Sequence, residues 1–588
     1  TVNSLTFENN GSLAVEDGGK LEISSGKLTV ASDSTSTVSG GKLTVSTTDL
    51  VKDGDGQLNL ENEVEVTNDA KVEAGLLAIK GNGVLKANNL IVQSGGTLGG
   101  DGTAEADVQV FGTLASGNSP GTLNITGDLT LDAGSTTEVE IESLSNYDQT
   151  IATGNISLNG TLTATSWNNG TISVGDKYDV FQSTGGTITG EFHTYNAPTN
   201  LRIRLLNTGT VASLRFAPET YTLMAQTQNQ FNVAAALDSF IPATSGDAMT
   251  VSTALDELTA VEYQAAFHQV MPNIHESISD ILLDQSFHQT KRTQQRLSLN
   301  RARDLASTQS GWRTWAQVNF DSMTASAFDA TPGYDNERDG FQVGADFAVS
   351  SDFQFGLFAG RDNNKVDYSP GTSLRTESMQ FGAYASMNAG SGFYIDAILT
   401  SSFVDLDTRR SITFGSIDRQ AKGDTESAQF GAALSLGREF KFGNFTFAPH
   451  AGIELSHLDI DGFAENGADS LDLGLADQSV KRFISELGAQ LSYRMQISEG
   501  LILIPELRVS MNSEMSDNGR TITARLEGGE GAAFNYVPSG RDRDGVSTSL
   551  GVSALRGDDW SASVYWNSHS MKRDGDSNSI SLSLDYKF

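Results

Sequence analysis

Short apolar triplets recur along residues 1–117 at steps of seven or eight residues. They first occur at 5–7, 13–15, 21–23 and 28–30, and Gly, Asn, Asp and Ser separate them. Very short strands with turn residues at a near-fixed interval predict a β-solenoid in which about three strands make one coil. Each coil would bury against its neighbours the apolar surface that it cannot bury alone.

From residue 309 onward the apolar residues fall on every second position instead. The last nine residues show this alternation with Ile580, Leu582, Leu584, Tyr586 and Phe588 on one face and polar side chains on the other. The same pattern is found at 341–349, 430–436 and 487–493. We count twelve such segments, each about 9–11 residues long, as a tilted membrane strand requires. They predict a 12-stranded antiparallel β-barrel with lipid outside and water inside.

The segments between the predicted barrel strands support this topology. Those after even-numbered strands are short, at 350–352, 388–391, 440–441, 498–500 and 556–559. Those after odd-numbered strands are long, for example 459–479 and 512–544. Short turns on one side and long loops on the other are typical of outer-membrane barrels, with the short turns and the C-terminus in the periplasm.

The β pattern stops between the two regions, where helical spacing takes over. It predicts helices at 228–238, at 252–271 before Pro272, and at 276–306. The second half of the last helix is basic and carries Lys291, Arg292, Arg296, Arg301 and Arg303.

Acidic residues occupy lumen-facing positions of the predicted barrel strands. They are Asp346, Asp396, Glu454, Glu486 and Glu506. A barrel of about twelve strands is wide enough for one helix but not for a folded domain. The hypothesis is therefore that the basic helix lies in the lumen, pairs with some of these acids and plugs the pore.

Composition narrows the class of protein. The formal net charge of the 588 residues is −34, which disfavours nucleic acid as a partner. The chain has no cysteine, which suits passage through an oxidising compartment in an unfolded state. No apolar run reaches the roughly 18 residues of a transmembrane helix. Because a strand-like rhythm begins at residue 1, we expect a processed product or the C-terminal part of a longer protein.

Candidate chemistry is sparse. The loop at 53–56 resembles a calcium loop, but Leu58 and Val64 stand where that loop needs a glycine and a bidentate glutamate. Three histidines lie in the linker without the i, i+4 spacing of a metal site: His268, His275 and His288. We expect no catalytic residue, no cofactor-binding site and no metal site.

Several stretches resemble the autotransporters of the type V secretion class, in their monomeric form. Residues 95–131 are similar to the end of the passenger β-helix, and 147–192 to the autochaperone segment. From these two stretches the resemblance assigns to the autochaperone motif Ser119, Pro120, Gly121, Tyr147, Asp148, Gly160, Leu162, Gly190 and Phe192. The resemblance implies a right-handed parallel β-helix whose cap folds first outside the cell. It also implies that the barrel-assembly machinery reads the terminal strand.

Four segments follow from these observations: a passenger β-helix at 1–117, its autochaperone cap at 118–216, a helical linker at 217–308 and a translocator barrel at 309–588. The expected function is export of the chain's own passenger and its display, adhesin-like, at the surface of the outer membrane. Expected partners are outer-membrane lipid and lipopolysaccharide, the barrel-assembly machinery, periplasmic chaperones and an unknown surface or host ligand. The chain would act as a monomer.

Two alternatives stay open. One is an enzyme passenger, a hydrolase or lyase with its catalytic part upstream. A cluster of acids with Lys or Arg on one solenoid face would favour it. The other is a porin-like barrel with a periplasmic solenoid, which an empty lumen with a constriction loop would favour.

Overall fold

The structure, a computed structural model of the chain, describes residues 2–8, 10–32, 34–46, 48–303, 311–328, 331–514, 520–528, 533–538, 544–557, 559–571 and 575–587. Two compact units are present. The first comprises Thr1–Met224 with Thr253–Tyr263, and the second comprises Ala225–Ser252 with Gln264–Phe588. None of the described helices combines the length and the apolar character that a membrane span would need.

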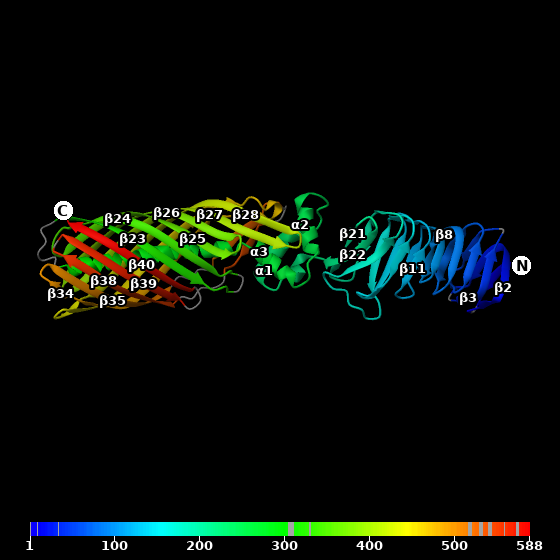
Figure 1. Cartoon of the computed structure of the whole chain (residues 1–588), viewed down its shortest axis with the longest axis horizontal. Helices are drawn as coiled ribbons and strands as arrows, with labels where there is room; N and C mark the ends of the chain where they lie inside the picture. The colour runs from blue at the N-terminus through cyan, green and yellow to red at the C-terminus, as the bar shows by residue number, and fades with distance from the viewer. Residues whose placement is uncertain are drawn as a thin grey trace. The chain divides into compact units, whose positions relative to one another are not determined.

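The first unit is a solenoid of strands stacked in parallel (Figure 1). Its strands are β1 (Val2–Phe7), β2 (Ser12–Val30), β3 (Thr35–Val45), β4 (Leu50–Asp53), β5 (Gln57–Leu60), β6 (Glu63–Val66), β7 (Ala70–Ile79), β8 (Val84–Gly100), β9 (Thr103–Val110), β10 (Thr113–Ser116), β11 (Thr122–Ile125), β12 (Leu129–Leu131), β13 (Thr136–Ser143), β14 (Asn146–Tyr147), β15 (Gln149–Ala152), β16 (Ile156–Leu158), β17 (Thr161–Ser166), β18 (Lys177–Ser183), β19 (Ile188–Gly190), β20 (Thr194–Asn196), β21 (Leu201–Asn207) and β22 (Val211–Pro218).

The predicted β-solenoid is confirmed. Leu77, Leu98 and Leu114 stack on one another in successive coils and are at most 1% exposed, so their side chains form a continuous core. The predicted separation of the triplets at 13–15, 21–23 and 28–30 is wrong, because all three lie within β2. The strand bends around the coil and keeps its ladder of hydrogen bonds.

The coils widen toward the C-terminal end of the solenoid. Ala70 pairs with Leu90, twenty residues on, whereas Thr161 pairs with Thr194, thirty-three residues on. Aromatic rings fill the larger interior, and Tyr178 packs against Phe216 with 5.7 Å between ring centroids. An antiparallel hairpin of β21 and β22 then pairs with β18 and closes the end of the stack. Without such a cap the last coil would expose an unpaired, aggregation-prone edge.

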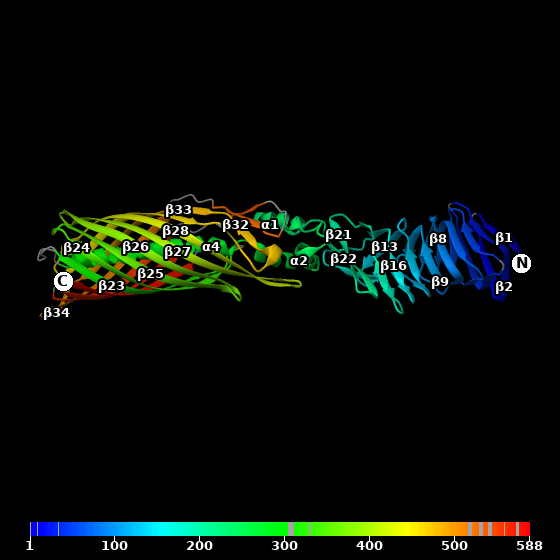
Figure 2. The same cartoon turned by 90° about the horizontal axis from the view of Figure 1, so that it is seen from above.

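The second unit contains the barrel (Figure 2). Its long strands are β23 (Gly311–Ala325), β24 (Tyr334–Ala348), β25 (Phe353–Ser369), β26 (Thr372–Gly390), β27 (Phe393–Phe414), β28 (Ile417–Arg438), β30 (Phe445–Ile460), β33 (Gln478–Tyr493), β35 (Leu501–Glu514), β38 (Asp544–Arg556), β39 (Trp560–Met571) and β40 (Gly575–Lys587). These twelve strands pair in chain order, and pairing of β23 with β40 closes the barrel. The predicted fold class is confirmed.

Short periplasmic turns are found where the sequence predicts them, with one exception. Residues 440–441, predicted as a turn, belong to β29 (Phe440–Phe442), which pairs with β30 and moves the turn to 443–444. A second short strand, β34 (Met495–Ser498), pairs with β35 at the same end. Two hairpins thus extend beyond the ladder of the twelve long strands at this end of the barrel.

The predicted pattern on the opposite side is partly wrong. The β25–β26 and β27–β28 hairpins close through the short turns 370–371 and 415–416 instead of long loops. Their strands take up the length, and β27 and β28 each have 22 residues. The prediction of about 9–11 residues covered only the lipid-facing part. The ladder continues beyond it because each added pair satisfies backbone N–H and C=O groups.

Two loops that the sequence left without structure form a small sheet. The 4-stranded sheet contains β31 (Phe463–Ala464), β32 (Leu473–Leu475), β36 (Ile522–Leu526) and β37 (Phe534–Tyr536). A 3₁₀ turn at Asp469–Leu471 precedes β32. Helix α1 covers the edge of this sheet, where the Asn229 side chain accepts from the Val537 N–H at 2.9 Å and donates to its carbonyl oxygen at 2.8 Å.

The helices are α1 (Gln228–Asp238), α2 (Gly246–Asp256), α3 (Glu262–Val270) and α4 (Ile274–Ala302), after a 3₁₀ turn at Tyr221–Met224. The first prediction is confirmed, but the single helix predicted at 252–271 is two. Glu262 accepts from both the backbone N–H and the hydroxyl of Thr259 at 2.8 Å, which starts a new helix at that point. Helix α4 begins two residues before its predicted start, and 304–306 lie outside the described residues.

We predict that Gly100→Ala destabilises the solenoid. Gly100 has φ of +103°, and a Cβ there would lie 1.9 Å from the Ile79 carbonyl oxygen. The loss should exceed about 1 kcal/mol, because both the backbone conformation and the close approach disfavour a side chain. Limited proteolysis should cleave the variant faster between residues 79 and 117. Gly134→Ala is the control, since nothing lies within 4 Å of its Cβ position, and equal cleavage of both variants would contradict the prediction.

Candidate functional sites in the lumen and the cap

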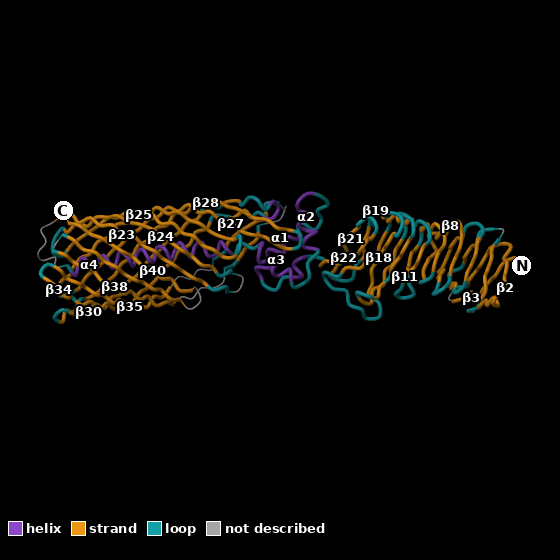
Figure 3. Tube along the Cα trace, in the orientation of Figure 1, coloured by secondary structure: helices purple, strands orange, loops and turns teal. Residues whose placement is uncertain are grey.

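Helix α4 runs along the inside of the barrel (Figure 3). Every residue from Ile274 to Arg301 is buried except Asp280, although most are polar or charged. Its apolar first half packs through Ile278, Ile281 and Leu282 against inward-facing strand residues. Polar contacts follow further along the helix, where the Gln285 side chain donates to the Asp362 carboxylate at 3.1 Å. A helix that is buried on all sides yet polar requires polar walls, and the lumen provides them.

The basic half of α4 meets carboxylates on opposite walls of the barrel. Lys291 lies 2.6 Å from Glu486, Arg292 lies 3.2 Å from Asp321, and Arg301 lies 2.7 Å from Asp396. Arg296 pairs with Asp346 on β24 and, at 2.6 Å, with Asp585 on β40. Arg303 lies 3.5 Å from the same Asp585. These ion pairs fix the helix in rotation and in depth.

Two of the acids proposed to face the helix have closer partners than its basic residues. Glu454 lies 3.8 Å from Arg482 of the barrel wall, and Glu506 accepts hydrogen bonds from Ser298 at 3.1 Å and Gln490 at 2.8 Å. Sequence reasoning missed Asp321 and Asp585. Both occupy inward positions of the alternating pattern on the first and last barrel strands. The alternation could therefore have identified them as lumen-facing acids.

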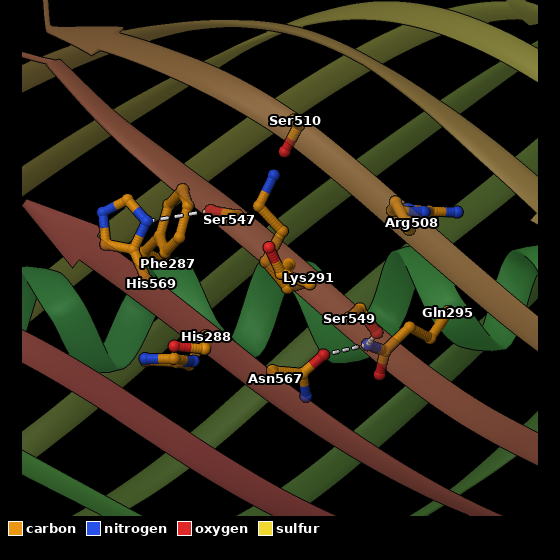
Figure 4. A pocket seen from close by; sticks show the side chains of 12 residues that line it. Phe287, His288, Lys291, Gln295, Arg508, Ser510, Ser547, Ser549, Asn567 and His569 are labelled. Carbon is orange, nitrogen blue, oxygen red and sulfur yellow. Dashed lines mark hydrogen bonds between the residues drawn. The ribbon is translucent and has the colours of Figure 1, made fainter.

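A small cavity lies beside the helix, between α4 and strands β35, β38 and β39 (Figure 4). Its volume is ≈20 Å³. It is lined by Phe287, His288, Lys291, Gln295, Arg508, Ser510, Ser547, Thr548, Ser549, Asn567, Ser568 and His569. That space suits about one water, not a solute of metabolite size.

The terminal strand β40 places its apolar residues outside the barrel. Ile580, Leu582 and Leu584 are 47%, 46% and 52% exposed on the lipid side. Tyr586 packs on Trp560 with 4.6 Å between ring centroids, at the periplasmic end. Phe588 lies outside the described residues. The strand pairs with β23 and β39 along its length and so forms the seam of the barrel.

The proposed autochaperone residues lie in the last coils of the solenoid. Asp148 is buried, and its carboxylate accepts from the backbone N–H groups of Gly121 at 2.9 Å and Glu140 at 2.8 Å. Burial outweighs these donors and raises the pKa of Asp148 to about 7.

The other residues of this set surround the same interior. Tyr147 packs edge-on against Tyr178 at 5.2 Å, and Phe192 lies 6.0 Å from Phe181. Leu162 is fully buried. Ser119, Pro120, Gly121 and Gly160 lie between strands, and the peptide bond between Ser119 and Pro120 is cis. Gly190 ends β19, and Gly160 and Gly190 have φ of +80° and +78°.

One solenoid face carries a ladder of alternating charge. Lys42 lies 3.0 Å from Glu63 and 2.6 Å from Glu65, while Lys86 lies 3.3 Å from Glu63 and 3.4 Å from Glu105. Hydrogen bonds from Lys42 and then Lys86 lower the pKa of Glu63. A general acid needs a raised pKa, so this cluster has the opposite electrostatics. Among the described residues no set of three His, Asp or Glu side chains is placed to hold a metal ion.

Comparisons with known proteins agree with this geometry. Residues 314–567 match the family model of the autotransporter β-domain. The chain is 24% identical over 476 residues to an extracellular serine protease of Serratia marcescens, covering 71% of this chain and 44% of that protein. It is 28% identical over 194 residues to a pertactin autotransporter of Bordetella bronchiseptica, covering 32% of this chain and 20% of that protein.

Among solved structures, the translocator domain of the autotransporter NalP from Neisseria meningitidis aligns with 52% of this chain and 98% of that chain, at a TM-score of 0.40 and 15% identity. This chain spans less than half the length of the curated relatives named above.

A closed barrel with lipid-facing apolar residues and a helix in its lumen defines an outer-membrane translocator. The match over 314–567 identifies that part of the chain as an autotransporter β-domain, and together with the relatives named above it supports a classical autotransporter of the type V secretion class. Its barrel lies in the outer membrane, and its β-helical passenger lies at the cell surface.

We predict that the cap loosens as the pH rises. The ordinary pKa of Asp148 is 3.8 and its folded value is about 7. The contribution of this carboxyl to stability is therefore full below about pH 4 and is lost as the pH rises through 7. Hydrogen exchange at the Gly121 and Glu140 amides, corrected for the chemical rate, should be faster at pH 8 than at pH 5. Asp148→Asn cannot ionise, so the same pH dependence in that variant would contradict the assignment.

We predict that Arg296→Gln opens the lumen. The change leaves Asp346 without its arginine and weakens the pairing of Asp585. Breaking a buried ion pair costs about 3–5 kcal/mol, which should loosen α4 and raise single-channel conductance in planar bilayers. Lys365→Gln is the matched control, since Lys365 pairs with Asp367 on the exposed surface. Equal conductance of the wild type and Arg296→Gln would refute the role of this pair.

Proposed function

We propose that the barrel exports the chain's own passenger and then keeps α4 in the lumen as a plug. The observation that carries this proposal is the set of ion pairs between α4 and the barrel wall, together with the small cavity beside the helix. A helix with four basic residues in its second half, followed directly by Arg303, has no stable place in lipid, and it neutralises the acidic lumen that receives it.

Lumen size favours passage of an unfolded passenger. Twelve strands enclose enough room for one helix, so a solenoid with coils of twenty or more residues could cross only as an extended chain. The absence of cysteine suits that route, because no disulfide can form before export. Folding of the cap outside the cell would then oppose return, since each coil gains stability by stacking on a folded neighbour.

For the passenger we propose display of an adhesin-like surface without bond chemistry of its own. The solenoid face does carry a cluster of acids with lysines, the feature that would favour an enzyme passenger, but the lowered pKa of Glu63 makes that residue a poor general acid. The relative from Serratia marcescens is named as a protease, which keeps an enzyme passenger as the second candidate. Any catalytic part would then lie upstream of residue 1.

We further propose the partners that such a route requires. The barrel-assembly machinery would read Ile580, Leu582, Leu584, Tyr586 and Phe588, and periplasmic chaperones would hold the chain unfolded. Outer-membrane lipid and lipopolysaccharide would surround the barrel, and a surface or host ligand would bind the passenger. The protein would act as a monomer, since its closed barrel has no free edge to pair with another copy.

We predict that protease added to intact cells digests the passenger only when the barrel assembles. The chain would be fused to a signal peptide at Thr1 and expressed in a Gram-negative host. Phe588 deletion should abolish digestion of residues before about 216, because the terminal strand would no longer be recognised. Gly134→Ala serves as a control that leaves the barrel untouched.

Protection of the passenger in cells whose barrel is assembled would contradict the proposal. Such a result would favour a porin-like anchor with a periplasmic solenoid.

A further inference from the structure

A phenylalanine-rich hairpin extends from the periplasmic end of the barrel. Phe440 pairs with Phe447 and Phe442 pairs with Phe445, so all four rings share the outer face. Phe442 and Phe445 are 67% and 48% exposed. Phe445 also contacts Tyr493, with 4.4 Å between ring centroids. Rings gathered at one end of a barrel mark the level where hydrocarbon meets headgroups.

A single arginine is inserted among these rings. Arg438 ends β28 at an outward position, two residues after Leu436, which is 53% exposed. Its guanidinium carbon lies 4.8 Å from the centroid of Phe393 and 4.7 Å from that of Phe440. Contact with two rings holds the guanidinium in one orientation.

A backbone carbonyl oxygen orients the Arg438 guanidinium by accepting a hydrogen bond from its Nε. Arg438 Nε donates to the Ser391 carbonyl oxygen at 3.2 Å. Ser391 has φ of +54° between Gly390 and Gly392, which have φ of +80° and +79°. A Cβ on Gly392 would lie 2.4 Å from the Glu439 carbonyl oxygen, so the turn is pressed against the end of the strand. The acceptor is therefore part of a compact turn.

Arg438 differs from the lumen arginines in its partners. Arg292, Arg296 and Arg301 each pair with a carboxylate. Within the part of the chain that the structure describes, no carboxylate lies within 4.0 Å of the Arg438 guanidinium. The Nε–H of Arg438 donates to the Ser391 carbonyl oxygen. The two terminal nitrogens hold the other N–H donors of the guanidinium, which lies at the membrane interface. An anion at that level would complete the pairing.

We propose that Arg438 binds the phosphodiester of a glycerophospholipid in the periplasmic leaflet of the outer membrane. The two terminal nitrogens would donate to two phosphate oxygens, and the neighbouring phenylalanine rings would contact the glycerol and the upper acyl chains. This inference rests on the proposed function insofar as the barrel spans the outer membrane with its short turns in the periplasm.

The test is lipid binding by the full chain in detergent, followed by native mass spectrometry. The probe is dioleoyl phosphatidylglycerol, and dioleoylglycerol, which lacks the phosphate, is the paired probe. Arg438→Gln should weaken the first phosphatidylglycerol adduct about tenfold, and Arg438→Lys should lie between, because ammonium lacks the planar fork. Neither change should alter dioleoylglycerol binding. Arg556→Gln is the matched control, an exposed arginine opposite Trp560 at the same end of the barrel.

A further arm separates a lipid from a free anion. Inorganic phosphate at the same concentration as the lipid should leave the adduct in place, since it has no acyl chains to contact the rings. Displacement of the lipid by inorganic phosphate would overturn the assignment to a phospholipid. Equal phosphatidylglycerol affinity of the wild type, Arg438→Gln and Arg556→Gln would overturn the site itself.

Folding and export are checked separately. If Arg438→Gln fails to give a folded barrel, Phe440→Leu keeps the charge and removes one ring, and it should weaken the adduct about threefold. Unchanged affinity in Phe440→Leu under those conditions would refute the site. Surface digestion of the passenger in cells expressing Arg438→Gln tests the proposed function on its own. Normal digestion with unchanged lipid binding would refute only this inference.

Discussion

Charge pairing inside the barrel is the interaction on which the second unit depends. Helix α4 places basic side chains in the buried interior of the barrel, and an unpaired charge there would be very costly. Arg296 illustrates the solution, because it reaches carboxylates on β24 and β40, the strands on either side of β23. The same contacts that neutralise the helix therefore tie it to the wall where the barrel closes.

Closure of the barrel in turn decides what each strand can carry. Each of the twelve long strands pairs with a neighbour on both sides, so the described main ladder has no open edge toward lipid. Alternate residues can then be apolar outside and polar inside without conflict, as Leu584 and Asp585 are on β40. Acidic residues are tolerated on the inner face because the helix brings the matching cations.

The solenoid solves the edge problem differently. Its coils stack in one direction, and the stack would end in an open coil without a cap. Widening of the last coils makes room for Tyr178 and Phe181, and the antiparallel β21–β22 hairpin covers the end. Asp148 joins the turn at Gly121 to strand β13 through backbone N–H groups, at the cost of burying a carboxyl.

The spacing of apolar residues predicts two periodicities, and with them the solenoid, the twelve barrel strands and the lumen helix. Short-range patterns suffice there because side-chain alternation and turn residues reflect local geometry. Which charges meet follows from the folded barrel alone, as Glu506 faces Ser298 while Asp585 meets Arg296. Pairing across a lumen depends on strand stagger and helix rotation, and neither leaves a trace in local spacing. For the same reason the length of β27 and β28 and the stacking of Arg438 between two rings appeared only in the folded chain.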